Sequence, residues 1–100
     1  MINVTHEATD WFKHELGIEE GQAVRFFARY SAGGELHPGF SLGLQVEPPM
    51  SAGLSSVIDG ITFYMEDKDM WYLDGYDLQV AYDQALEGID FKYVPQVSTI

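Results

Sequence analysis

The residue types best suited to metal chemistry lie in a glycine-rich segment, residues 31–39, between two predicted strands. Glu35 and His37 stand two positions apart there, and a carboxylate and an imidazole at this spacing can share one borderline metal ion. Two protein ligands from one chain make a weak site unless a neighbouring subunit contributes further ligands. We favour the simpler interpretation, in which both are solvent-facing loop residues and Leu36 alone turns inward.

Arg25 and Arg29 are candidates for contact with an anion or a partner protein. Both project from the same face of the predicted strand 24–30, in a chain with only five basic residues. Two guanidinium groups can clamp a small anion or a carboxylate if both side chains line one open pocket. The structural alternative, which we favour, is that they pair with acidic side chains on adjacent strands.

Arrangements of catalytic residues are missing from the sequence. It has no Ser-His-Asp order with supporting motifs, no phosphate-binding loop and no His-Glu-x-x-His motif. His6 and His14 share the first predicted helix but lie eight positions apart, too far for the i, i+4 pair that binds one metal ion. Acidic residues are plentiful, yet nothing marks one pair as acid and base. We therefore expect a protein without enzymatic activity and without a bound cofactor.

Aromatic residues in the second half of the chain allow two interpretations. Because such residues are enriched at the centres of protein interfaces, the group can be an exposed contact surface. Membership of the hydrophobic core is the commoner outcome and the one we favour. The group consists of Met70, Trp71 and Tyr72 together with Tyr64, Tyr76 and Tyr82.

One helix and several short strands must position these residues. Thr5 is a suitable N-cap for an amphipathic helix over residues 6–16, and Asp69 is expected to cap one later helical turn. Residues 48–56 contain two prolines and several small side chains, so we expect an exposed connection there. Alternating apolar residues predict strands over 24–30, 40–46, 57–66 with a hairpin turn at Asp59-Gly60, 78–82 and 89–94. The predicted core consists of Trp11, Phe12, Phe26, Leu42, Leu44, Ile61, Phe63 and Val80.

Composition and charge restrict the class of protein. One hundred residues suit one domain, and 46% hydrophobic residues can supply its core. Sixteen acidic residues against five basic ones give a formal charge of −11, which repels nucleic acid phosphates and anionic lipids. No apolar run reaches the length of a membrane span, and the N-terminus lacks a signal-peptide pattern. We expect a cytoplasmic protein that binds neither nucleic acid nor a membrane.

The order of these segments resembles the HesB-like domain of the A-type iron-sulfur carriers. Members of that family open with a Val-Thr-x-x-Ala helix, matched by residues 4–8, and continue with a Val-Arg strand before a glycine loop, matched by Val24-Arg25. Further matches are Asp59-Gly60-Ile61-Thr62-Phe63, Trp71-Tyr72-Leu73-Asp74-Gly75 and Gly88-Ile89-Asp90-Phe91. The predicted fold is therefore α+β: a mainly antiparallel β sandwich or flattened barrel with an N-terminal helix. We expect one domain over residues 1–95 and a loose tail over residues 96–100.

The sequence departs from the family at the positions of its metal ligands. Members that carry clusters use one cysteine in the glycine loop and a Cys-x-Cys pair in the C-terminal tail, whereas this chain has no cysteine. Within the family it resembles a cysteine-free branch from Gram-positive bacteria. The resemblance implies a non-catalytic protein that assists iron-sulfur cluster assembly through protein partners, and a homo-oligomer is compatible with it. Two alternatives stay open: a mononuclear metal-binding protein using Glu35 and His37, and a small-anion-binding module using Arg25 and Arg29.

Overall fold

A ten-residue helix, α1 (His6–Glu15), lies near the start of the chain in the computed structural model, which describes residues 1–32, 34 and 36–96. The side-chain oxygen of Thr5 accepts a hydrogen bond from the backbone N–H of Ala8 at 3.1 Å, so the predicted N-cap is confirmed. Gly17 follows the helix with a φ of 65°, the left-handed conformation that ends many helices. The predicted helix is confirmed to within one residue.

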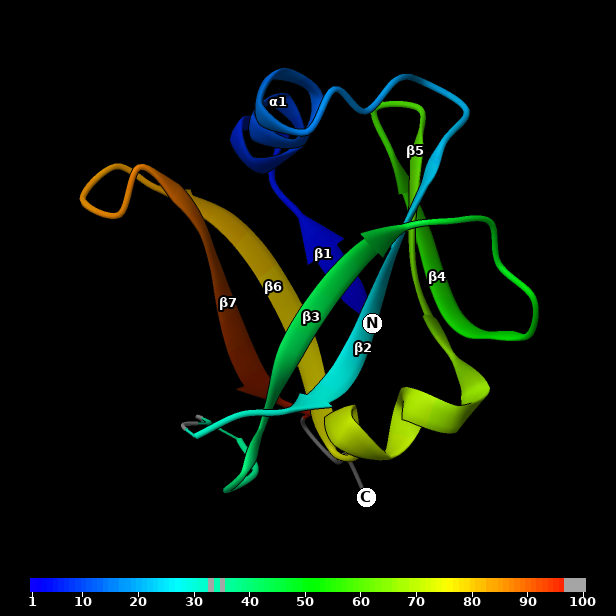
Figure 1. Ribbon diagram of the computed structural model, residues 1–100, viewed down its shortest axis with the longest axis vertical. Helices are drawn as coiled ribbons and strands as arrows, with labels where there is room; N and C mark the ends of the chain where they lie inside the picture. The colour runs from blue at the N-terminus through cyan, green and yellow to red at the C-terminus, as the bar shows by residue number, and fades with distance from the viewer. Residues whose placement is uncertain (33, 35, 97–100) are drawn as a thin grey trace.

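Two β-sheets make up most of the described chain (Figure 1). In chain order the strands are β1 (Ile2–Val4), β2 (Ala23–Tyr30), β3 (Phe40–Val46), β4 (Ala52–Ile58), β5 (Ile61–Glu66), β6 (Tyr76–Asp83) and β7 (Gly88–Pro95). A 3-10 helix, η1 (Asp67–Leu73), connects β5 to β6. The four-stranded sheet has the order β3-β2-β5-β4, and the three-stranded sheet has the order β1-β6-β7. Both sheets are mixed, because β2 runs parallel to β5 and β1 runs parallel to β6.

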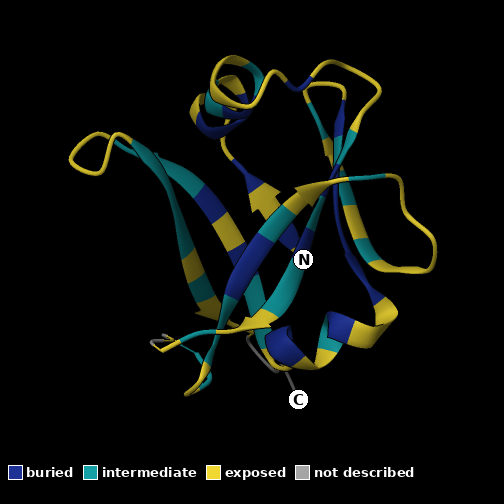
Figure 2. Cartoon of the chain, viewed as in Figure 1, coloured by how far each residue is buried: buried dark blue, intermediate teal, exposed yellow. Residues whose placement is uncertain are grey.

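One hydrophobic core lies between the two sheets and beneath α1 (Figure 2). Phe12 of α1 and Phe26 of β2 each contact Phe63 of β5, with ring centroids 5.2 and 6.1 Å apart. Phe91 of β7 meets Phe26 edge-on at 5.7 Å and so joins the two sheets. Six of the predicted core residues are buried: Phe12, Phe26, Leu42, Ile61, Phe63 and Val80. The other two, Trp11 and Leu44, are half-buried and pack against this core.

The arrangement of the sheets confirms the predicted fold class and shows which of the two predicted forms, a sandwich or a flattened barrel, is present. The protein is α+β, with two packed sheets, mostly antiparallel neighbours and an N-terminal helix. The strands β3 and β7 each have only one neighbour within the described residues, so the sheets do not close into a barrel. The open form leaves strand edges that a closed barrel would not have.

The strand β4 corrects the sequence analysis. The prediction of an exposed connection over residues 48–56 is wrong, because β4 begins at Ala52 and pairs antiparallel with β5. The predicted hairpin turn between them is confirmed, with φ values of 51° at Asp59 and 81° at Gly60. The small residues of β4 are tolerated because it is an outer strand that backbone hydrogen bonds hold to β5. The sequence also did not indicate β1, whose pairing partner β6 lies near the other end of the chain.

The fold gathers three segments at the end of the molecule opposite α1. These are the loop between β2 and β3, the helix η1 and the end of β7 (Figure 1). Gln96, the first residue of the predicted tail, donates its backbone N–H to the Gly75 carbonyl oxygen at 2.9 Å. Residues 97–100 lie outside the described part, so the domain boundary stays a prediction. None of the helices described has the length and apolar character that crossing a membrane requires.

Candidate functional site

A group of aromatic rings lies partly exposed at the end of the molecule that carries the β2–β3 loop. We name it the aromatic end and define it as Tyr30, His37, Phe40 and Trp71. The ring centroids of Tyr30 and Phe40 lie 4.9 Å apart. The Trp71 ring lies 5.2 Å from that of Phe40 and 5.3 Å from that of His37. Tyr30 is 87% exposed and Trp71 is 46% exposed, so large apolar rings that touch one another also meet water.

Three elements bring the rings of the aromatic end together. Tyr30 ends β2 and lies opposite Phe40, which begins β3. The loop between them is closed by a hydrogen bond from the Ser31 backbone N–H to the Gly39 carbonyl oxygen at 2.9 Å, and Gly39 has a φ of 82°. Trp71 comes from η1, much later in the chain. The surface therefore depends on long-range packing and is not visible as a sequence pattern.

The predicted aromatic group lies partly in the hydrophobic core and partly on the exposed surface. Trp71 is exposed, whereas its neighbour Tyr72 and the more distant Tyr64 are fully buried. Met70, Tyr76 and Tyr82 are half-buried. The core interpretation applies to most of the group, and Trp71 alone joins the exposed surface, together with rings from β2 and β3.

His37 lies within the aromatic end and already uses one ring nitrogen. Its Nε2 donates a hydrogen bond to the Tyr72 carbonyl oxygen at 3.0 Å, so Nδ1 is the nitrogen left for a further partner. Glu35 lies outside the described residues, and the described chain holds no group of three or more side chains suited to a metal ion. One imidazole nitrogen is too few ligands for a stable site. A metal site at Glu35 and His37 stays a prediction.

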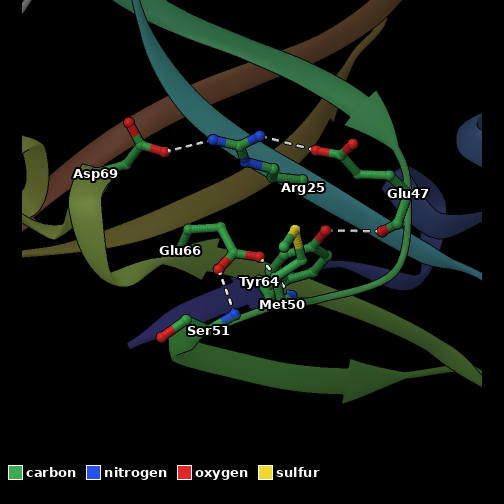
Figure 3. A network of polar contacts seen from close by, with 7 residues as sticks. All are labelled: Arg25, Glu47, Met50, Ser51, Tyr64, Glu66 and Asp69. Carbon is green, nitrogen blue, oxygen red and sulfur yellow. Dashed lines mark hydrogen bonds and ion pairs between the residues drawn. The ribbon is translucent and has the colours of Figure 1, made fainter.

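Arg25 lies in a network of ion pairs on the face of the four-stranded sheet that points away from the core (Figure 3). Its Nη1 donates to Glu47 Oε1 at 2.8 Å and its Nη2 donates to Asp69 Oδ2 at 2.9 Å. The side chains of Arg25 and Asp69 are only 16% and 11% exposed. The hydrogen bonds to Glu47 and then Asp69 raise the pKa of Arg25. Arg25 thus bridges the end of β3 to η1, as the structural alternative requires.

Arg29 lies apart from this network. It is exposed, and its Nε makes a long contact of 3.4 Å with Ser41 Oγ. Arg29 lines a cavity of about 400 Å³ beside Phe91, whereas Arg25 lines a different cavity of about 390 Å³ beside Glu66. The structure does not bring the two guanidinium groups into one pocket. Contact of either arginine with an anion or a partner stays a prediction.

Glu66 fastens the loop over residues 47–51 to the same face of the sheet (Figure 3). Its carboxylate accepts hydrogen bonds from the backbone N–H groups of Met50 at 2.8 Å and Ser51 at 2.6 Å. Below the loop, the Tyr64 hydroxyl donates to the Glu47 carbonyl oxygen at 2.7 Å. No sequence pattern marks Glu66, because a carboxylate that binds backbone groups requires no fixed spacing of residue types.

Asp69 has a different role from the one that the sequence predicted. The helix η1 begins at Asp67, and no side chain caps its N-terminus, so the predicted capping by Asp69 is wrong. Its carboxylate instead accepts the hydrogen bond from Arg25. Arg25 belongs to β2, 44 positions earlier in the chain, and its hydrogen bond to Asp69 forms in place of a local helix cap.

Replacing Glu66 with glutamine is expected to reduce the acid dependence of stability. The hydrogen bond from Met50 is the main cause that lowers the pKa of Glu66, with a further contribution from Ser51. The stabilisation is therefore present above the ordinary glutamate pKa and is lost as the pH falls through the lowered value. Thermal melts should show Glu66→Gln melting below the unaltered protein at pH 7, and the gap should narrow between about pH 5 and pH 3.

The control for this experiment is Glu15→Gln. Glu15 is exposed and its side chain has no hydrogen bond or ion pair with another described residue, so its substitution should leave the melting temperature nearly unchanged at each pH. A gap between Glu66→Gln and the unaltered protein that stays constant from neutral to acid pH would contradict the assigned role of Glu66.

Relatives of similar sequence occur in Bacillus and Staphylococcus. The chain is 40% identical over 92 residues to a protein of Bacillus subtilis (strain 168) named pyruvate dehydrogenase inhibitor. The matched region covers 92% of this chain and 97% of that protein. It is 30% identical over 93 residues to an uncharacterized protein of Staphylococcus saprophyticus, with 90% and 95% of the two chains covered. An uncharacterized protein of Staphylococcus aureus (strain USA300) is 36% identical over 77 residues, or 74% and 79% of the chains. No family model matches the chain.

Solved structures of two iron-sulfur proteins share the fold. The crystal structure of IscA with its [2Fe-2S] cluster superposes with a TM-score of 0.56 and 21% identity, covering 95% of this chain and 82% of that chain. Escherichia coli SufA, involved in the biosynthesis of iron-sulfur clusters, superposes with a TM-score of 0.57 and 17% identity, covering 98% and 82%. The agreement extends over nearly the whole chain, which confirms the fold that the sequence resemblance implied.

An iron-sulfur cluster does not fit the donor groups of this protein. Such clusters are anchored by thiolates, and the sequence contains no cysteine. The β2–β3 loop instead contributes to the aromatic end, and the one imidazole described there is bonded to the Tyr72 carbonyl oxygen. The fold is shared with IscA and SufA, but this chain has no thiolate with which to anchor a cluster. By its sequence the chain belongs to the family of the Bacillus subtilis pyruvate dehydrogenase inhibitor, and it is a cysteine-free protein of the HesB-like fold.

Proposed function

We propose that this protein is a non-catalytic, protein-binding inhibitor of pyruvate dehydrogenase that acts in the cytoplasm. The observation that carries the proposal is the 40% identity to the Bacillus subtilis inhibitor, which extends over 97% of that protein. At this identity, two chains of similar length share their fold and most of their core. Inhibition by binding also agrees with the absence of a recognisable catalytic arrangement from the sequence.

The aromatic end is the surface best suited to bind such a target. Tryptophan and tyrosine dominate the binding energy of many protein interfaces because they bury large rings at a low cost in conformational entropy. Trp71 and Tyr30 offer such rings. Each contacts the ring of Phe40, and Trp71 is held further by His37 and Tyr72. A preorganised surface loses little freedom on binding and so retains more of its interaction energy.

The test measures the rate of NADH formation by purified pyruvate dehydrogenase at increasing concentrations of this protein. The unaltered protein should inhibit in a saturable way. Trp71→Ala should need about 30-fold higher concentration for the same inhibition, as expected for removal of an interface residue worth about 2 kcal/mol. Circular dichroism should show that the variant stays folded, because nearly half of the Trp71 surface is exposed.

Leu86→Ala is the matched control for this experiment. Leu86 is a large apolar residue that is 65% exposed, and it lies in the turn between β6 and β7, away from the aromatic end. Its removal should leave inhibition unchanged. A protein that neither binds nor inhibits pyruvate dehydrogenase would overturn the proposed function, and equal effects of both substitutions would overturn the assignment of the surface.

A second candidate is an accessory role in iron-sulfur cluster assembly through partner proteins. The likeness of the fold to IscA and SufA favours it, although identities of 21% and 17% support the fold alone. Cross-linking in the native cell, followed by mass spectrometry of the captured proteins, separates the two candidates. Recovery of pyruvate dehydrogenase subunits would support the first candidate, and recovery of the assembly machinery without them would support the second.

A further inference from the structure

A groove lies between α1 and β6, at the end of the molecule opposite the aromatic end (Figure 1). It has a volume of about 310 Å³. We name it the α1 groove, and it is lined by Glu7, Asp10, Trp11, His14, Glu15 and Tyr82. Trp11 and Tyr82 are half-buried, so each side chain is partly covered by the fold and partly accessible in the groove. Trp11 is fixed further by an edge-on contact with Phe12, with ring centroids 5.3 Å apart.

The carboxylates of the α1 groove make no ion pair within the described chain, although Asp59 and, to a smaller extent, the charge of Asp10 raise the pKa of His6. Glu7, Asp10 and Glu15 are exposed, and no hydrogen bond or ion pair joins their side chains to another described residue. Lys13 is the one lysine of the helix, and its charge acts on Asp59 instead, whose pKa it helps to lower. Glu7 and Asp10 stand three positions apart on the helix, where like charges repel, and a bound cation would relieve that repulsion.

The two rings and the three carboxylates suit a guanidinium group. Arginine stacks its planar head on aromatic faces and donates paired hydrogen bonds to carboxylates. The formal charge of −11 also draws a basic segment toward the protein before contact. We propose that the α1 groove binds an arginine side chain in an exposed segment of a partner protein. This is a second contact surface and goes beyond the proposed function, because it does not use the aromatic end.

The test follows the two tryptophan indole N–H signals by NMR while a peptide of alternating arginine and glycine is added to the full chain. The Trp11 signal should shift in a saturable way, and the Trp71 signal should stay in place. A peptide with citrulline in place of arginine has nearly the same shape without the charge and should not bind. Added salt should weaken the binding of the arginine peptide, because the contact is largely electrostatic.

Two pairs of substitutions separate a local site from the overall negative charge. The double substitution Glu7→Gln with Asp10→Asn should lower the affinity for the arginine peptide by about tenfold or more. Glu19→Gln with Glu20→Gln removes the same charge from the loop before β2 and should change the affinity by less than about twofold. Equal weakening by both pairs, or equal binding of the citrulline peptide, would overturn the proposal. A Trp11 signal that moves with protein concentration alone would also overturn it, because a second copy would then cover the groove.

Discussion

Reconstitution of the purified protein with iron and sulfide should leave no stable [2Fe-2S] or [4Fe-4S] cluster, whereas IscA treated in parallel should acquire one. Soft thiolates anchor such clusters, and this chain has none to offer. Carboxylates are hard oxygen donors and do not replace the soft thiolates that anchor sulfide-bridged iron. The formal charge of −11 will attract some iron without specificity, so the protein is desalted in moderate salt before measurement.

The measurement combines visible absorption with Mössbauer spectroscopy. Sulfide-bridged iron gives charge-transfer bands and a Mössbauer signature that adsorbed iron lacks. A persistent cluster at stoichiometric iron would contradict the prediction and would require thiolates from outside the chain, such as glutathione.

Replacing Arg25 with alanine should lower the free energy of unfolding by about 2 to 3 kcal/mol. The substitution removes both hydrogen bonds that join Glu47 to Asp69 through one guanidinium group. Asp69 is only 11% exposed, so its carboxylate would lose its counter-ion where water compensates poorly. Arg25→Lys should recover only part of the loss, because lysine lacks the two separate nitrogens with which the guanidinium group reaches Glu47 and Asp69. Urea denaturation followed by circular dichroism measures these differences.

Arg29→Ala is the control for the Arg25 substitutions. The two arginines come from the same strand, but Arg29 is exposed and makes only the 3.4 Å contact with Ser41. Its removal should change the free energy of unfolding by no more than about 0.5 kcal/mol. A similar loss in both alanine variants would show that burial of the ion pairs does not explain the effect.

Elements with local signals were predicted well. The helix α1 follows from its apolar spacing and from Thr5, whose side chain reaches a backbone group three residues away. The strands β2 and β3 follow from alternation, because each buries one face. The turn at Asp59-Gly60 follows from residues that accept a positive φ. In each case the cause lies within a few residues of the effect.

Elements held by distant partners were missed. The strand β4 begins with the small, exposed residues Ala52 and Gly53, and it forms because the turn places it beside β5. The short strand β1 exists only because β6 receives it in parallel, and neither strand carries a sign of the other in its own residues. Asp69 was misassigned for the same reason, since Arg25 lies in a different element.

The sequence by itself determined that this protein has no thiolate chemistry, a strong negative charge and a HesB-like order of elements, because these depend on residue types and local order alone. Tertiary structure decided which residues of each candidate group are exposed enough to contact a partner or a ligand. Arg25 is covered and paired while Arg29 is free of ion pairs within the described chain, and Trp71 is exposed while its neighbour Tyr72 is fully buried. Neighbouring positions differ in this way because burial depends on which distant strand or helix covers a side chain, and no local spacing records that contact.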